Sequence, residues 1–93
     1  MAIYLVTPFQ GNLSAIEQQA HSLGFETFRL QGDTGLFVSA DLPTVELSHR
    51  LGITNEDRTA GPNGLALVTA VTSYYGRGNG TMWDWLKIKM EQG

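Results

Sequence analysis

Residues 25–40 read FETFRLQGDTGLFVSA, and this stretch decides the fold. Its first six residues alternate in polarity and place Phe28 and Leu30 on one face, as a half-buried strand does. The glycine-rich segment 31–35 contains residues that favour tight turns, and it leads directly into the apolar run 36–40. The sequence therefore predicts a β-hairpin in the middle of the chain.

A strand and a helix are predicted on each side of this hairpin. The apolar run 3–7 predicts a central strand, and residues 12–24 show the capping, spacing and terminal glycine of a helix. Downstream, residues 41–52 predict a second helix and residues 65–72 a fourth strand, joined by a long, mobile loop over 54–63. Right-handed crossovers then give an α+β, ferredoxin-like βαββαβ sandwich with strand order 4-1-3-2.

The C-terminal segment adds one more element to this sandwich. Thr81 can cap a helix on which Met82, Trp85 and Leu86 share a face. The expected architecture is therefore one domain over residues 1–93, with a third helix after the fourth strand.

Composition and charge limit the classes of function. A hydrophobic fraction of 42% and a charged fraction of 16% are typical of one folded domain. A net charge of −3 gives no overall basic field, which argues against nucleic acid as a partner. The chain has no cysteine, which agrees with a cytoplasmic location, and its first residues resemble neither a signal peptide nor a membrane span.

The glycine-rich loop before the last helix is the candidate anion site. It follows a strand and opens a helix, a setting in which backbone N–H groups can hold an anion. Its spacing matches neither a dinucleotide-binding motif nor a P-loop, so a flexible turn is the favoured interpretation. The residues of this candidate site are Gly76, Arg77, Gly78, Gly80 and Thr81.

The titratable side chains form no catalytic or metal-binding pattern. His21 and His49 lie near the C-terminal ends of predicted helices, where the helix dipole favours a protonated imidazole. Carboxylates next to the hairpin and in the long loop are interpreted as turn and cap residues. The sequence assigns no catalytic, cofactor-binding or metal-binding residue, and no cofactor is expected.

Aromatic side chains suggest two kinds of surface. Phe25, Phe28 and Phe37 can form a platform for stacking RNA bases, but the absent RNP pattern makes core or dimer packing the favoured interpretation. On the last helix one tryptophan is expected to face outward, because the helix cannot bury apolar groups on every side. The predicted partner-binding residues are therefore Tyr74, Tyr75, Trp83 and Trp85, and the alternative is that both tryptophans cover the open face of the sheet.

Four segments resemble small prokaryotic ferredoxin-like proteins related to the CRISPR adaptation endonuclease subunit, including chains labelled SinR-like. They are the N-terminal strand MAIYLV (1–6), the hairpin strand GLFV (35–38), SADL (39–42) at the second helix, and WDWL (83–86). The resemblance implies the same fold and a homodimer. Members with nuclease activity carry an acidic residue after the first strand, whereas this chain has Thr7-Pro8-Phe9 there.

The preferred functional hypothesis is a non-enzymatic interaction or regulatory module, homodimeric and able to bind a protein partner. The first alternative is a metal-dependent nuclease or toxin-like ribonuclease, which rests on the resemblance only. The second alternative is a small anionic ligand at the glycine-rich loop.

Overall fold

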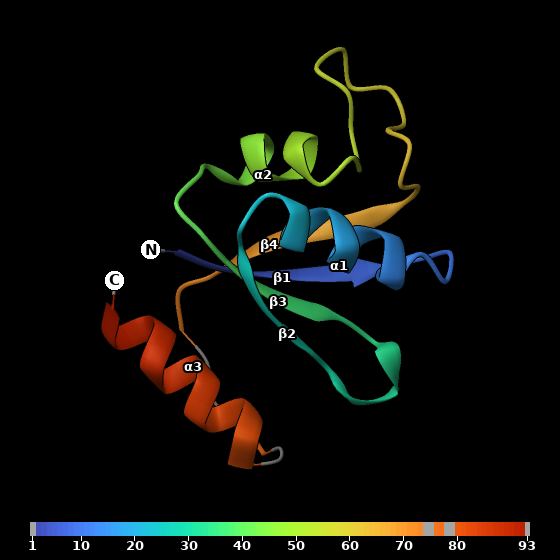
Figure 1. The fold of residues 1–93 in the computed structure, drawn as a ribbon. Coiled ribbons are helices and arrows are strands. Elements are labelled where there is room, and N and C mark those ends of the chain that lie inside the picture. The colour runs from blue at the N-terminus through green and yellow to red at the C-terminus, as the bar shows by residue number, and fades with distance from the viewer. Residues whose placement is uncertain (1, 74–75, 78–79, 93) are drawn as a thin grey trace.

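The computed structural model describes residues 2–73, 76–77 and 80–92, and it confirms the expected order of elements (Figure 1). Seven helices and strands follow one another in the order β-α-β-β-α-β-α within the described ranges, so the α+β class is confirmed. The elements are β1 (Ala2–Pro8), α1 (Leu13–Ser22), β2 (Glu26–Arg29), β3 (Leu36–Ala40), α2 (Thr44–Arg50), β4 (Ala66–Val71) and α3 (Gly80–Gln92).

The four strands form one antiparallel sheet in the order β2-β3-β1-β4, which is the predicted order. Tyr4 of β1 lies opposite Val38 of β3 on one side and opposite Ala70 of β4 on the other. Since β1 and β3 occupy the centre, β2 and β4 are the two edges of the sheet.

The predicted hairpin joins β2 to β3 through a short 3₁₀ turn at Gln31–Asp33. Gly32 and Asp33 both have positive φ angles, of 76° and 55°, which glycine and aspartate tolerate better than other residues. The Leu30 N–H donates to the Gly35 carbonyl at 2.9 Å and closes the loop. The glycine-rich segment 31–35 therefore forms the tight turn that its residues predict.

Side chains of β1 alternate between the two faces of the sheet, and both faces are covered. Tyr4 and Val6 belong to a core under α1 and α2, whereas Ile3 belongs to a second core under α3. The continuous apolar character of β1 follows from this arrangement, because a strand covered on both faces needs no polar side. Figure 1 shows α3 set apart from α1 and α2.

The first core fills the space between the sheet and the two crossover helices. From the helices it takes residues at helical spacing, and from the central strands residues at alternate positions. Its buried members are Tyr4, Val6, Leu13, Ile16, Ala20, Leu36, Val38, Ala40, Leu47, Leu51 and Ile53.

The second core lies between the sheet and α3. Trp85 lies 6.1 Å, between ring centroids, from both Phe28 and Phe37. Trp83 also packs against this core, so both tryptophans are partly buried. This differs from the expectation that one tryptophan faces outward, and it agrees with the alternative in which both cover the open sheet face.

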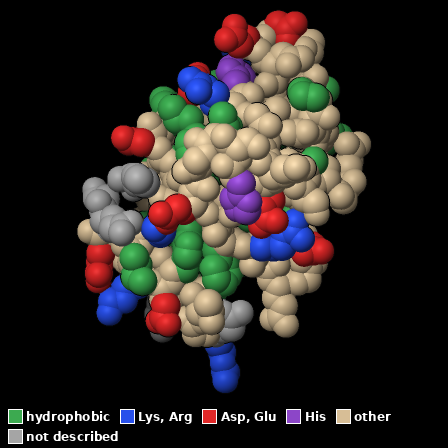
Figure 2. Space-filling model, viewed as in Figure 1, with side chains coloured by type: hydrophobic (Ala, Val, Ile, Leu, Met, Phe, Trp, Pro, Cys, Tyr) green, Lys and Arg blue, Asp and Glu red, His purple; other side chains and the backbone are tan. Residues whose placement is uncertain are grey.

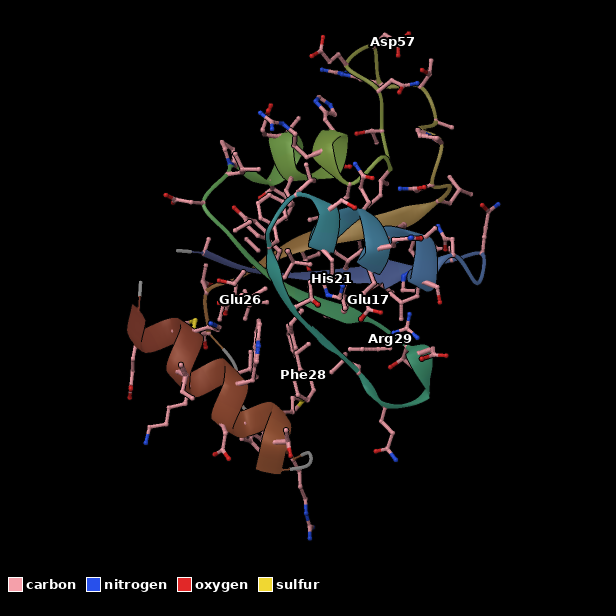
Figure 3. All side chains as sticks on the ribbon, in the orientation of Figure 1. Glu17, His21, Glu26, Phe28, Arg29 and Asp57 are labelled. Atoms are coloured by element: carbon pink, nitrogen blue, oxygen red, sulfur yellow. The ribbon has the colours of Figure 1, made fainter. Side chains whose placement is uncertain are left out.

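The three phenylalanines do not form one platform. Phe25 packs against the first core, whereas Phe28 and Phe37 lie in the second core. Figure 3 shows Phe28 in the space between β2 and α3. Since α3 covers two of these rings, they are core residues in this structure, as the favoured interpretation expected.

The long loop after α2 makes hydrogen bonds to segments on both sides of it, and its expected mobility stays a prediction. Asn63 donates from Nδ2 to the Leu51 carbonyl at 2.7 Å, and Asn12 donates from Nδ2 to the Asn63 carbonyl at 2.6 Å. A side chain at Gly61 would place its Cβ against the Gly52 carbonyl oxygen, closer than Cβ atoms approach backbone oxygen in real structures. The close backbone approach at Gly61 and the Asn63 amide hold the loop against the segment that follows α2, and the Asn12 amide holds its end against the segment before α1.

Candidate interaction surface

The two edge strands of the sheet differ in the features that prevent association. β2 has four residues and carries two charged side chains. Arg29 forms ion pairs with Glu17 at 3.3 Å and with Asp33 at 3.2 Å, and Glu26 pairs with Lys89. Short length and charge are the usual means of blocking edge-to-edge pairing, so the β2 edge is protected.

The β4 edge has none of these features. Its six residues read ALVTAV and include no charged residue and no proline. No other strand in the described part of the chain covers its outer side. An uncharged edge strand of this length is a template for pairing with another strand.

The hydrogen-bonding register identifies which groups of β4 face outward. The Phe9 N–H donates to the Leu65 carbonyl at 3.1 Å, and Leu5 lies opposite Thr69. Hydrogen-bonded pairs recur at every second residue of an antiparallel ladder, so Leu65, Leu67, Thr69 and Val71 bond to β1. The N–H and C=O groups at positions 66, 68 and 70 therefore point away from the sheet.

Apolar side chains accompany this open edge. Leu67 lies opposite Thr7, on the sheet face that α3 covers further along, and it is 51% exposed. Leu65 and Phe9, hydrogen-bonded to each other next to it, are 53% and 62% exposed. These three residues form an apolar strip beside β4, which is defined here as the β4 strip.

A groove lies on the other side of the same edge, between α2 and β4. Its volume is about 460 Å³, and it is lined by side chains from both elements and from the loop between them. Val45 of α2, at 66% exposed, is part of the lining, together with Ala66, Leu67 and Val68 of β4. The edge strand therefore has apolar surface on both sides.

One titratable side chain, His49, and one cationic side chain, Arg58, line this groove. His49 belongs to the last turn of α2, as the sequence predicts, and Arg58 belongs to the loop. Arg58 has a φ angle of 71°, which is unusual for a residue with a side chain. Its N–H donates to the Asn55 carbonyl at 2.9 Å, which fixes the turn at the tip of the loop.

Asp57 stabilises the same turn. Its Oδ1 accepts hydrogen bonds from the hydroxyl and the backbone N–H of Thr59. The Thr59 hydroxyl, followed by the Thr59 N–H, lowers the pKa of this carboxyl, because both bonds favour the ionised form. Figure 3 shows Asp57 at the end of the loop, far from α3.

Other titratable residues have structural partners, His21 and Arg29 among them. His21 exchanges a hydrogen bond of 2.8 Å with the Thr27 hydroxyl, and Arg29 is held by two carboxylates and by Ser14. Among the residues that the structure describes, no three of His, Cys, Asp and Glu gather as metal ligands. Figure 2 shows acidic and basic side chains interspersed on the face it presents.

The predicted anion loop and partner-binding residues are only partly placed. Tyr74, Tyr75 and Gly78 lie outside the described residues. Arg77 and Thr81 are exposed, and Gly80 is the first residue of α3. The described part of this loop therefore shows its residues at the surface and does not assemble them into a site.

Sequence reasoning did not select the β4 edge, although two signals for it were present. The predicted order 4-1-3-2 already places the fourth strand at an edge, and residues 65–72 contain no charge. Combining the two would have identified an unprotected edge. The groove had no such signal, because it depends on how α2 sits over β4.

Comparison of the chain with protein-family models, with curated proteins and with solved structures finds no match. The resemblance to CRISPR-adaptation-related proteins therefore stays a prediction. None of the described helices combines the length and apolar character that crossing a membrane requires. Fold and surface together define a class only: a small α+β sandwich with one protected and one open sheet edge.

Proposed function

We propose that this chain is a non-enzymatic interaction module that forms a homodimer through the outer edge of β4. The observation that supports the proposal is the contrast between the two edges. β2 carries charges held in ion pairs, whereas the outer side of β4 pairs with no other strand in the described part of the chain and is flanked by apolar side chains. The cysteine-free sequence agrees with a cytoplasmic location for such a module.

The open edge replaces the tryptophans as the leading contact. Trp83 and Trp85 are partly buried against the chain's own sheet, so they offer less surface to a partner than the β4 strip does. The metal-dependent nuclease and the anion-binding loop have no specific observation in their favour among the described residues. They stay alternatives to the proposal.

Light scattering coupled to size-exclusion chromatography tests the proposal with a matched pair of variants. Leu67→Lys places a charge in the β4 strip, and Ile88→Lys makes the same change on α3. The two side chains are 51% and 53% exposed, so the cost to the monomer is similar. We expect Leu67→Lys to raise the dimer dissociation constant at least about tenfold, about 1.4 kcal/mol.

Ile88→Lys is expected to keep the dimer mass of the unchanged chain. A chain that is monomeric at tens of micromolar would contradict the homodimer. A dimer weakened equally by both variants would remove β4 as its contact.

A further inference from the structure

We infer that β4 pairs with β4 of a second copy in one antiparallel register, centred on Val68, and that each α2–β4 groove receives side chains of the partner strand. The inference rests on the proposed function and specifies its geometry. It follows from three properties of the edge, namely the direction of its backbone groups, the alternation of its side chains and its charge.

The backbone groups restrict the register. In a symmetric antiparallel pair the same residues of both copies meet, so the register is defined by the residue on the twofold axis. A centre at Val68 places Ala66 opposite Ala70 of the second copy and Val68 opposite its own counterpart. Every outward-facing residue of β4 then lies in a pair that exchanges both N–H···O bonds.

Neighbouring registers use the edge less completely. A centre at Leu67 pairs Val68 with Ala66 and leaves Ala70 opposite Gly64, which lies outside the strand. A centre at Thr69 pairs Val68 with Ala70 and leaves Ala66 opposite Thr72, also outside the strand. A centre between two residues would place positions 66, 68 and 70 of the second copy on the opposite face of the sheet from those of the first, because side chains alternate with a period of two.

Side-chain alternation matches the same register. Residues 66, 68 and 70 face the helices α1 and α2, as Ala66 and Val68 already do where they pack against the first core. The second copy therefore directs its small apolar side chains toward the groove beside α2, which offers about 460 Å³ and an exposed Val45. On the opposite face, Leu67 meets Thr69 of the second copy, and the two Leu67 side chains are diagonal neighbours.

Charge agrees with a second copy as the occupant. Each chain has a net charge of −3, so two copies must meet where acidic side chains are absent. β4 carries no charge, and the residues that line the groove include no Asp or Glu. The surface that fits the backbone pattern is thus also free of acidic side chains, and Arg58 is the cationic residue in the groove lining.

Cysteine scanning tests the register directly, because the chain has no cysteine of its own. We would make Leu67→Cys, Val68→Cys and Thr69→Cys separately in the full chain and oxidise each with oxygen. A hydrogen-bonded antiparallel pair holds its Cα atoms about 5.5 Å apart, within the range of about 4.4–6.8 Å for a disulfide. Only Val68→Cys is expected to give a covalent dimer in high yield on non-reducing gels.

The double variant Leu67→Cys/Thr69→Cys provides a second measurement that does not change a partly buried residue. In the proposed register, position 67 of each copy lies opposite position 69 of the other, so the introduced thiols meet in pairs across the interface. We therefore expect a covalent dimer from the double variant although neither single variant forms one. Both positions are exposed, so the monomer fold is not at risk.

The outcomes separate this inference from the proposed function. A covalent dimer from Leu67→Cys or Thr69→Cys alone, instead of Val68→Cys, would overturn the register while β4 remained the contact. Dimers under reducing conditions without cross-linking of any of the four variants would place the contact elsewhere. Monomers in every reducing run would overturn the proposed homodimer itself.

Discussion

Single residues at the tip of the loop after α2 show how a polar segment becomes ordered without a core. Asp57 and Thr59 close one turn, and Asn55 closes the next by donating from Nδ2 to the Ala60 carbonyl at 3.1 Å. Asx-type bonds of this kind replace the backbone bonds that a helix or strand would provide. The tip of the loop is therefore shaped by hydrogen bonds among its own side chains and backbone.

The Asp57 carboxyl gives a test of this turn. We expect Thr59→Ala to raise the pKa of Asp57 toward its ordinary value of 3.8, because the variant removes the hydroxyl that favours the ionised form. NMR titration of the Asp57 side chain would measure the change. Thr44→Ala is the control, since Thr44 lies on α2 and outside this turn, and an Asp57 pKa unchanged in Thr59→Ala would contradict the assignment.

The sign of the linked stability follows from the direction of the shift. A carboxyl whose pKa is lower in the folded state stabilises the fold fully above its unfolded pKa, and this contribution disappears as the pH falls through the folded pKa. The contribution of the Asp57 carboxyl to the stability of the fold is therefore expected to be lost as the pH falls below the ordinary pKa of 3.8. Thr59→Ala reduces this contribution.

At the level of elements, α3 is held by a few large side chains. Trp85 contacts the rings of Phe28 and Phe37, and Lys89 pairs with Glu26 of the edge strand β2. Aromatic pairs add about 0.5–1.5 kcal/mol beyond the area they bury. Trp85 therefore contributes to the free energy that keeps α3 on the sheet, together with the fully buried Leu86.

Trp85→Ala is expected to lower the free energy of unfolding by about 2–4 kcal/mol, near the lower end for large aromatic truncations because the ring is partly exposed. Urea denaturation followed by circular dichroism would measure it. Ile88→Ala, on the exposed side of the same helix, should cost less than about 1 kcal/mol. Equal losses from the two variants would mean that α3 does not cover the second core.

Most elements could be predicted from the sequence, because local signals and tertiary packing agree there. Gly24 and Gly52 both have positive φ angles where the two crossover helices end, as the glycine positions predict. The alternation of residues 25–30 similarly predicted the hairpin strand, which the structure places at Glu26–Arg29. Each of these predictions depends on a few neighbouring residues.

The predictions that differed from the structure depended on contacts between distant residues. The outward tryptophan failed because Phe28 and Phe37 give α3 an aromatic surface to cover, which the period of the helix alone does not reveal. The hydrogen bond that Asn12 donates to the end of the long loop could not be predicted for the same reason, because Asn12 lies 51 residues before Asn63. The groove beside β4 is likewise a product of how α2 packs.

For the whole molecule, the two edges of the sheet differ, and the proposed dimer depends on this difference. One edge is short and charged, one edge is uncharged, and both faces carry helices. A sandwich of this kind buries both faces of its sheet within one chain, so a strand of another chain can be added only at the β4 edge. Growth at β4 alone ends at two copies, since an isologous pair leaves only the protected β2 edges outside.

Thermal unfolding at several protein concentrations tests this closed assembly. Only folded chains form the dimer, so dimerisation stabilises the folded state more at higher protein concentration. The Tm of the unchanged chain is therefore expected to rise by a few degrees between micromolar and hundreds of micromolar concentrations. Leu67→Lys should remove most of this dependence, and Ile88→Lys should keep it. A Tm independent of concentration in a chain that is dimeric throughout would contradict the linkage, and particles larger than dimers would contradict closure at the β2 edges.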